Sequence, residues 1–227
     1  MATRTQPRGV CAFCGLETTK AAMSRHFAKC PRLMEAIEKA DAAQSGAEVL
    51  LHLRVQDAHL KEFWLDLEMR GASPLKKLDA YLRAIWLECC GHLSEFSPGG
   101  WGSGKVGMSQ TASKAFESAL QLTHIYDFGT SSETLVSLVA TRRGNALTKH
   151  PITLLARNIL PVAVCQECDQ NATHLCMECQ IEHDQPGMLC EAHSQNHPHS
   201  GYGELLPLVN SPRLGMCGYD GPAEAPY

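Results

Sequence analysis

The chain has 227 residues and a formal net charge of −4, which is enough for one medium-sized domain with small attachments. It has 11 cysteines, an odd number, and its N-terminus lacks the apolar core of a secretory signal, so a disulfide framework is disfavoured. No apolar run of about 18 residues occurs, which excludes a membrane-spanning helix, and we expect a cytoplasmic protein with reduced thiols.

Residues 1–32 contain a zinc-finger motif. The motif is Cys11-x2-Cys14-x11-His26-x3-Cys30. A C-x2-C turn supplies two thiolates from one place, and His26 and Cys30 share one helical face because they are four residues apart. The spacing is close to that of small ββα fingers, with cysteine as the last ligand. We therefore expect an independent finger that binds one zinc ion.

The predicted finger is rich in positive charge. Only one acid, Glu17, opposes its basic residues, and a zinc ion with three thiolates subtracts a single charge. The basic residues include Arg8, Lys20, Arg25, Lys29 and Arg32. Such a face predicts contact with nucleic-acid phosphates. A solubilising charged face on a protein-binding finger explains the same pattern equally well.

The middle of the chain is predicted to be an α+β domain. Residues 33–46 are expected to form a linker helix, and residues 47–160 a central, small, mixed sheet with two main helices. Strands are expected where apolar and polar residues alternate, and the first two strands should pair as a hairpin. The predicted strands are residues 49–55, 63–69, 92–96, 122–128, 134–140 and 152–156.

Two helices are predicted in this domain. The first follows Ser73-Pro74, an N-cap residue before a proline at the first helical position, and ends at Gly91. Its apolar stripe includes Cys89. The second helix is expected within residues 108–120.

Cys89, Cys90 and His92 are a candidate redox or metal site. Adjacent cysteines seldom share one metal, and Cys89 belongs to an apolar stripe, so we interpret Cys89 and Cys90 as buried thiols. Cys217 is a separate cysteine in the tail, and we expect it to pack beside the C-terminal zinc-binding segment.

Residues 161–200 contain four close pairs of metal ligands. Four pairs are enough for two tetrahedral zinc sites without an open position for water, which indicates structural metal. The interleaved order, first pair with third and second with fourth, resembles B-box and RING modules and is favoured, although consecutive sites fit as well. His174 and His183 are alternative ligands. The pairs are Cys165 with Cys168, Cys176 with Cys179, Cys190 with His193, and His197 with His199.

The C-terminal zinc-binding segment is acidic. No Lys or Arg occurs between Arg157 and Arg213. An acidic surface repels phosphate, so we expect this segment to bind a protein partner or to brace the domain. Residues 201–227 should form a tail that packs back on the body and frays at its last residues. The carboxylates of this stretch are Glu167, Asp169, Glu178, Glu182, Asp184, Glu191 and Glu204.

Three further stretches carry recognisable motifs. They are Trp86-Leu87-Glu88-Cys89-Cys90-Gly91-His92-Leu93-Ser94-Glu95-Phe96, then Tyr126-Asp127-Phe128-Gly129, then Asn210-Ser211-Pro212-Arg213 with Cys217-Gly218-Tyr219. Over residues 47–160 the chain resembles the plasmid pRiA4b ORF-3-like family, and its zinc segment and tail are similar to a zinc-bearing subset. The resemblance implies a compact α+β fold found in bacteria and mobile elements, with no established reaction. The chain departs from the pattern at residues 130–132, where many members have a tryptophan nearby, and at His193 and His199, where cysteine is frequent.

Together these features predict a non-enzymatic protein with three structural zinc ions that acts as a protein-interaction or adaptor module, with an unidentified protein partner. The first alternative is nucleic-acid binding through the basic finger. The second is a metal- or thiol-dependent enzyme centred on Cys89, Cys90 and His92.

Overall fold

The structure is a computed structural model that describes residues 6–43 and 46–227. Within these ranges, eight strands form the sheet of the body. They are β1 (Arg8–Cys11), β2 (Glu17–Thr19), β3 (Glu48–Asp57), β4 (Trp64–Arg70), β5 (Ser94–Ser97), β6 (Gln121–Tyr126), β7 (Ser132–Gly144) and β8 (Ile152–Asn158). The strand order is β2-β1-β8-β4-β3-β7-β6-β5, and each described pair is antiparallel.

The prediction of a small mixed sheet was wrong, whereas the α+β character is confirmed. The six predicted strands correspond to β3 through β8, because alternating apolar and polar residues locate strands. β4 and β6 are nevertheless buried on both faces, since helices cover both sides of the sheet. β3 and β4 form the predicted hairpin, with Val55 opposite Leu65. The sheet is larger than expected because the zinc-finger segment adds β1 and β2 at one edge.

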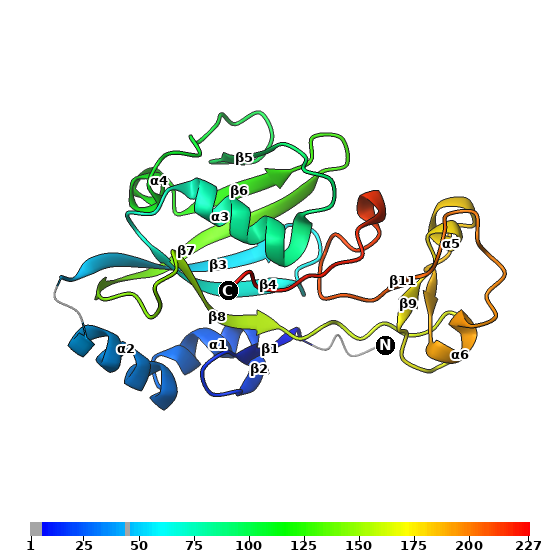
Figure 1. Cartoon of the computed structure of the whole chain (residues 1–227), viewed down its shortest axis with the longest axis horizontal. Coiled ribbons are helices and arrows are strands. Elements are labelled where there is room, and N and C mark those ends of the chain that lie inside the picture. Colours follow the sequence, from blue (N-terminus) through cyan, green and yellow to red (C-terminus); the bar gives the residue numbers. More distant parts are fainter. Residues whose placement is uncertain (1–5, 44–45) are drawn as a thin grey trace.

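One face of the sheet is covered by α3 (Leu75–Leu82) and α4 (Ala112–Ser118), as Figure 1 shows. α3 runs directly into η1 (Arg83–Leu87), a turn of π-helix. The apolar stripe of this first helix is buried against the sheet, with Leu78, Trp86 and Tyr126 fully enclosed in the main core. Two main helices were predicted, and both are present.

The starts of these helices differ from the prediction. Pro74, and not Ser73, occupies the N-cap position of α3, and it makes no side-chain capping bond. α4 begins at Ala112, where the hydroxyl of Thr111 accepts a hydrogen bond from the backbone N–H of Lys114. An N-cap hydroxyl that accepts a hydrogen bond from the first turn is a strong helix start signal. It explains why α4 begins at Ala112, although the predicted range begins at residue 108.

The opposite face of the sheet is covered by α1 (Lys20–Phe27) and α2 (Pro31–Ala43). α2 is the predicted linker helix, and residues 44–45 of that prediction lie outside the described ranges. β1 pairs with β8, and a shared core joins Cys11, Met23 and Cys30 of the finger to Trp64 of β4. The predicted independent finger is therefore built into the body (Figure 1).

Gly9 lies where the finger meets the sheet. A Cβ atom at this position would overlap the ring of Trp64 and the carbonyl oxygen of Arg157. We expect Gly9→Ala to lower the free energy of unfolding by about 1–3 kcal/mol, because overpacking forces side chains or backbone to shift. Urea denaturation would measure the change. Gly107→Ala is the matched control because a Cβ there meets nothing within 4 Å, and equal stabilities of the two variants would contradict the prediction.

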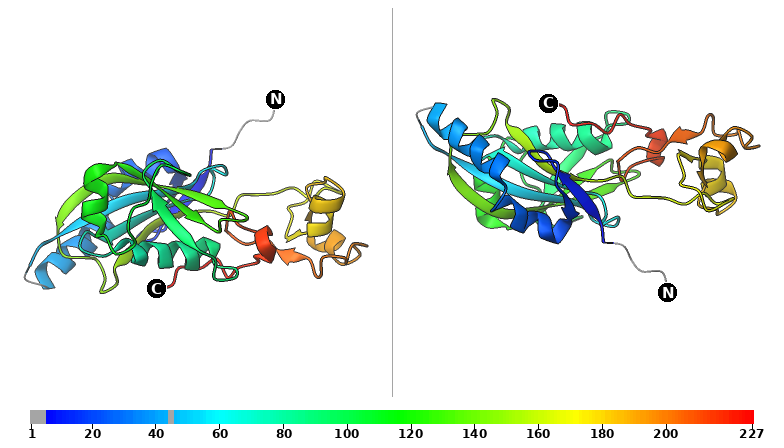
Figure 2. Two further views of the ribbon diagram at one scale, coloured as in Figure 1. Left: turned by 90° about the horizontal axis from the view of Figure 1, so that it is seen from above. Right: turned by 90° about the horizontal axis from the view of Figure 1, so that it is seen from below.

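The C-terminal segment that holds the four predicted ligand pairs projects from the body in all three views (Figures 1 and 2). We call residues 161–207 the C-terminal module. Its three-stranded sheet has the order β10-β9-β11 and packs beside two short helices. These elements are β9 (His174–Leu175), α5 (Met177–Glu182), β10 (Met188–Leu189), α6 (Glu191–Ser194) and β11 (Leu206–Pro207).

The tail returns to the body, as predicted. The hydroxyl of Ser211 donates to the carbonyl of Trp86 over 2.6 Å, and a short 3-10 turn, η2 (Met216–Gly218), follows. The last residues were expected to fray, but the ring of Tyr227 packs on Tyr81 and stacks on His150, with centroid distances of 5.6 and 4.2 Å. None of the helices in the described ranges has the length and apolar character needed to cross a bilayer.

Candidate metal centres

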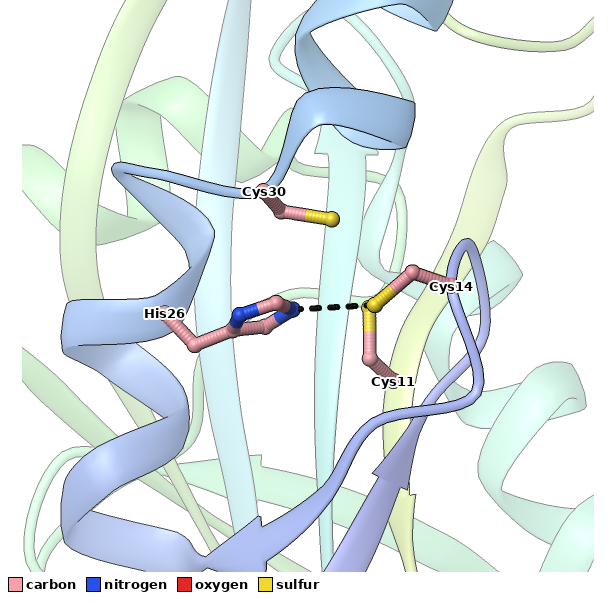
Figure 3. A group of neighbouring side chains, drawn as sticks. All are labelled: Cys11, Cys14, His26 and Cys30. Carbon is pink, nitrogen blue, oxygen red and sulfur yellow. Dashed lines mark hydrogen bonds between the residues drawn. The ribbon is translucent and has the colours of Figure 1, made fainter.

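The four ligands predicted in the finger lie together. Cys11 ends β1, Cys14 lies in the turn after it, His26 is on α1, and Cys30 precedes α2, as Figure 3 shows. Their ligand atoms all lie within 4.8 Å of one another. The hydroxyl of Thr19 starts α1 by accepting from the backbone N–H of Ala22, which directs His26 toward the thiols.

The distances between ligand atoms can be compared with those around zinc. Zinc bonds of about 2.3 Å to sulfur and about 2.0 Å to nitrogen imply tetrahedral edges of about 3.8 Å between sulfurs, about 3.5 Å between sulfur and nitrogen, and about 3.3 Å between nitrogens. In the finger, Cys14 Sγ lies 3.3 Å from His26 Nε2. This edge fits a single ion held by both residues.

Burial distinguishes the thiols of the finger. Cys11 and Cys30 are enclosed in the shared core, while Cys14 is exposed. Burial raises the pKa of the Cys11 thiol to about 11, because the charged thiolate is disfavoured there. A metal that binds at this site must displace the proton of Cys11, and its affinity should therefore increase with pH.

The C-terminal module groups its ligands in the interleaved order. The first cluster consists of Cys165, Cys168, Cys190 and His193. Its Cys168 and Cys190 sulfurs are 3.8 Å apart, and the sulfurs of Cys165 and Cys190 lie 3.4 and 3.3 Å from His193 Nδ1. These values match the edges of a zinc tetrahedron.

The second cluster consists of Cys176, Cys179, His197 and His199. Cys179 Sγ lies 3.3 Å from His197 Nε2 and 3.1 Å from His199 Nδ1, and the two ring nitrogens are 3.2 Å apart. His183 is not a member of this set. Its ring stacks on that of His199 at a centroid distance of 4.5 Å, and it forms a separate group of three possible ligands with Glu178 and His199.

The other alternative ligand, His174, bonds to the hydroxyl of Thr173 over 2.9 Å, and it belongs to none of the clusters formed by the described residues.

Backbone N–H groups lower the pKa of one thiol in the first C-terminal cluster. Burial opposes ionisation of Cys165, but the backbone N–H groups of Cys190 and Glu167 and the imidazole of His193 outweigh it. Together they lower the pKa of the Cys165 thiol to about 6. A thiol with this pKa is ionised at neutral pH, which is the form that zinc requires.

The apolar core of the C-terminal module is small. Its buried cluster consists of Cys176, Cys179 and Leu189, with Leu205 packed against it. Two of these residues are themselves candidate metal ligands. We therefore expect the fixed structure of the module to depend on metal bound at its candidate sites.

The predicted basic face of the finger is only partly available to a ligand. Arg8 donates to the carbonyl of Glu17, and Arg32 pairs with Glu35. Lys20 donates to Gln56 and to the carbonyl of Lys61, and burial together with the charges of Arg54 and Lys61 lowers its pKa. Arg25 and Lys29 are exposed and have no partner among the described residues. Nucleic-acid binding stays a prediction. Among the described residues of the finger, it is supported by the exposed and unpaired side chains of Arg25 and Lys29.

A fourth group of soft ligands combines the Cys89, Cys90 and His92 candidate, which was interpreted as buried thiols and not as a metal site, with Cys217, which was assigned elsewhere. Cys89, Cys90, His92 and Cys217 have ligand atoms within 4.8 Å of one another. The prediction of two buried thiols was wrong, because Cys90 is exposed and Cys89 is only partly buried. Cys217 packs against this group and not against the C-terminal module. The sequence signal was present in the Cys-Cys-Gly-His stretch, but the last member is too distant in the chain to be assigned by spacing.

Comparisons with known proteins place the chain in no family. No family model matches it, and no curated protein matches it. A solved structure that is similar is that of MM3350, a protein of unknown function from Methanosarcina mazei Go1. It is 17% identical with a TM-score of 0.40, and the match covers 47% of this chain and 68% of that protein.

Proposed function

We propose that this protein is a non-enzymatic zinc-binding protein of the cytoplasm whose C-terminal module holds a protein partner. The resemblance to the plasmid pRiA4b ORF-3-like family, with its link to mobile elements, stays a prediction. The zinc assignment is supported by the donor chemistry, since thiolate and imidazole in tetrahedral sets are typical of zinc.

The observation that carries this proposal is the saturation of each predicted site by four protein donors. A catalytic zinc normally keeps one position for water, whereas four protein ligands are typical of a structural site. The finger site and both sites of the C-terminal module have four such donors each. The metal ions would then fix surfaces, and the function would lie in what those surfaces bind.

The C-terminal module has the features of a binding surface. It projects from the body (Figure 1), and six of its seven carboxylates are exposed. Ile181 and Tyr202 are exposed by 54% and 49%, and the hydroxyl of Tyr202 donates to Glu182, which places apolar and acidic groups side by side. A basic protein segment with an apolar residue is the chemistry that this surface complements.

A photo-crosslinking amino acid at position 181 should trap a discrete protein species in cells, because Ile181 is an exposed apolar residue of this surface. The same amino acid at position 120 is the matched control, since Leu120 is an exposed apolar residue of the body, with 73% of its surface accessible. Adding Cys179→Ser should abolish the species from position 181, since the variant removes a zinc ligand. Identical species from both positions, or none from position 181, would contradict a partner on this surface.

A further inference from the structure

The group formed by Cys89, Cys90, His92 and Cys217 lies where the tail meets the body. Cys89 and Cys90 follow η1, and Cys217 is in η2 of the tail. We propose that these four residues bind a fourth zinc ion, which clamps the tail to the body. The inference stands independently of the proposed partner of the C-terminal module.

Two distances within this group match the edges of a zinc tetrahedron, and all four ligand atoms lie within 4.8 Å of one another. The sulfurs of Cys90 and Cys217 are 3.7 Å apart, and Cys217 Sγ lies 3.5 Å from His92 Nε2. The edges expected for tetrahedral zinc are about 3.8 and about 3.5 Å. A disulfide between Cys90 and Cys217 would instead require about 2.05 Å. The donor set of three cysteines and one histidine is also that of the finger and of the first C-terminal cluster.

The backbone explains how adjacent cysteines can share one ion here. η1 ends at Leu87, so Cys89 and Cys90 are no longer held in a helix. Gly91 has a φ of +71°, which glycine adopts readily, and the next residue, His92, lies with its ligand atom within 4.8 Å of the thiols. Cys217 has a φ of +52°, a conformation that costs a non-glycine residue energy and persists only where contacts hold it.

The charge around the group suits a zinc site with three thiolates. Three thiolates and one zinc ion carry one net negative charge. Arg213 is fully buried beside them, and its Nη2 lies 3.4 Å from Cys89 Sγ and 2.7 Å from Asp127 Oδ2. A buried guanidinium is stable only with anions close to it. A thiolate of Cys89 that is bound to zinc would be such an anion.

The proposed clamp joins parts of the chain that are far apart in sequence. Ser211 already anchors the tail to the carbonyl of Trp86, and the zinc ion would fix it again at Cys217. Cys90 and Cys217 are both exposed, so this ion lies closer to solvent than an ion bound by the buried Cys11 and Cys30. We therefore expect it to leave before the others during slow chelation.

The zinc content of the full chain tests the proposal. Mass spectrometry under native conditions should find four zinc ions, one for each tetrad of ligands. Cys217→Ser and His92→Asn should each reduce the number by one. His59→Asn is the matched control, because His59 is exposed and belongs to no cluster among the described residues, and it should leave all four ions in place.

A second measurement does not depend on how well the variants fold. In the zinc-loaded wild type, the exposed thiols of Cys90 and Cys217 should resist alkylation by iodoacetamide and should react once a chelator is added. Three zinc ions together with freely alkylated Cys90 and Cys217 would overturn the proposal. A Cys90–Cys217 disulfide in protein purified without oxidant, seen as the loss of two thiol hydrogens from the intact mass, would overturn it as well.

Discussion

Replacing Cys179 by serine should unfold the C-terminal module and leave the body folded. Cys179 is fully buried and belongs to the small apolar core of the module as well as to its second metal cluster. Structural zinc supplies on the order of 10 kcal/mol of folding free energy, and this core has little to replace it. Hydrogen exchange would show loss of protection in residues 174–207 and retained protection in β3 and β4.

Ser194→Ala is the control for this variant, because Ser194 lies in α6 of the same module but supplies no ligand in the described clusters. It should retain both the protection and the zinc content of the wild type. If Cys179→Ser retained the protection of the module, apolar packing and not metal would hold this part of the chain together.

Replacing Arg54 by methionine should destabilise the body by about 3–5 kcal/mol, because it leaves the buried Asp66 without its main counter-charge. Two nitrogens of Arg54 each donate to a different carboxylate oxygen of Asp66 over 2.8 Å, and Asp66 is fully buried. Arg54 also donates to the hydroxyl of Ser24, so the same residue ties α1 to the sheet. Chemical denaturation would measure the loss.

Arg25→Met is the matched control for this substitution. Arg25 is an exposed arginine of α1 without a partner among the described residues, and its replacement should change stability by less than about 0.5 kcal/mol. Similar stabilities of the Arg25 and Arg54 variants would mean that Asp66 is compensated by His52 alone, whose Nε2 lies 2.8 Å from Asp66 Oδ1.

Local sequence patterns predicted local structure well. The strands around Val55 and Leu65 follow from the alternation of apolar and polar residues, and the apolar stripe after Ser73-Pro74 predicted α3. Metal ligands that lie within a few residues of one another, such as Cys165 and Cys168, were recognisable for the same reason. A tight turn fixes the distance between two such ligands independently of the rest of the fold.

Features that depend on distant pairing were not predicted. β1 has four residues, too few for a periodic signal, and its place beside β8 follows from the packing of Cys11 and Met23 on Trp64. Cys217 was likewise assigned to the wrong neighbours, because the path of the tail is determined by contacts such as that of Ser211 with Trp86. Sequence spacing contains no information on such contacts.

The pairing of β1 with β8 has a consequence for synthesis of the chain on the ribosome. The four ligands of the finger emerge early and can capture zinc at once, but β8 is among the last parts of the body to appear. Until then, the apolar side of the finger around Met23 lacks Leu155, its partner on β8. We therefore expect the nascent chain to display an undocked finger from the synthesis of Cys30 until β8 is made, and a chaperone that shields this side would act in that interval.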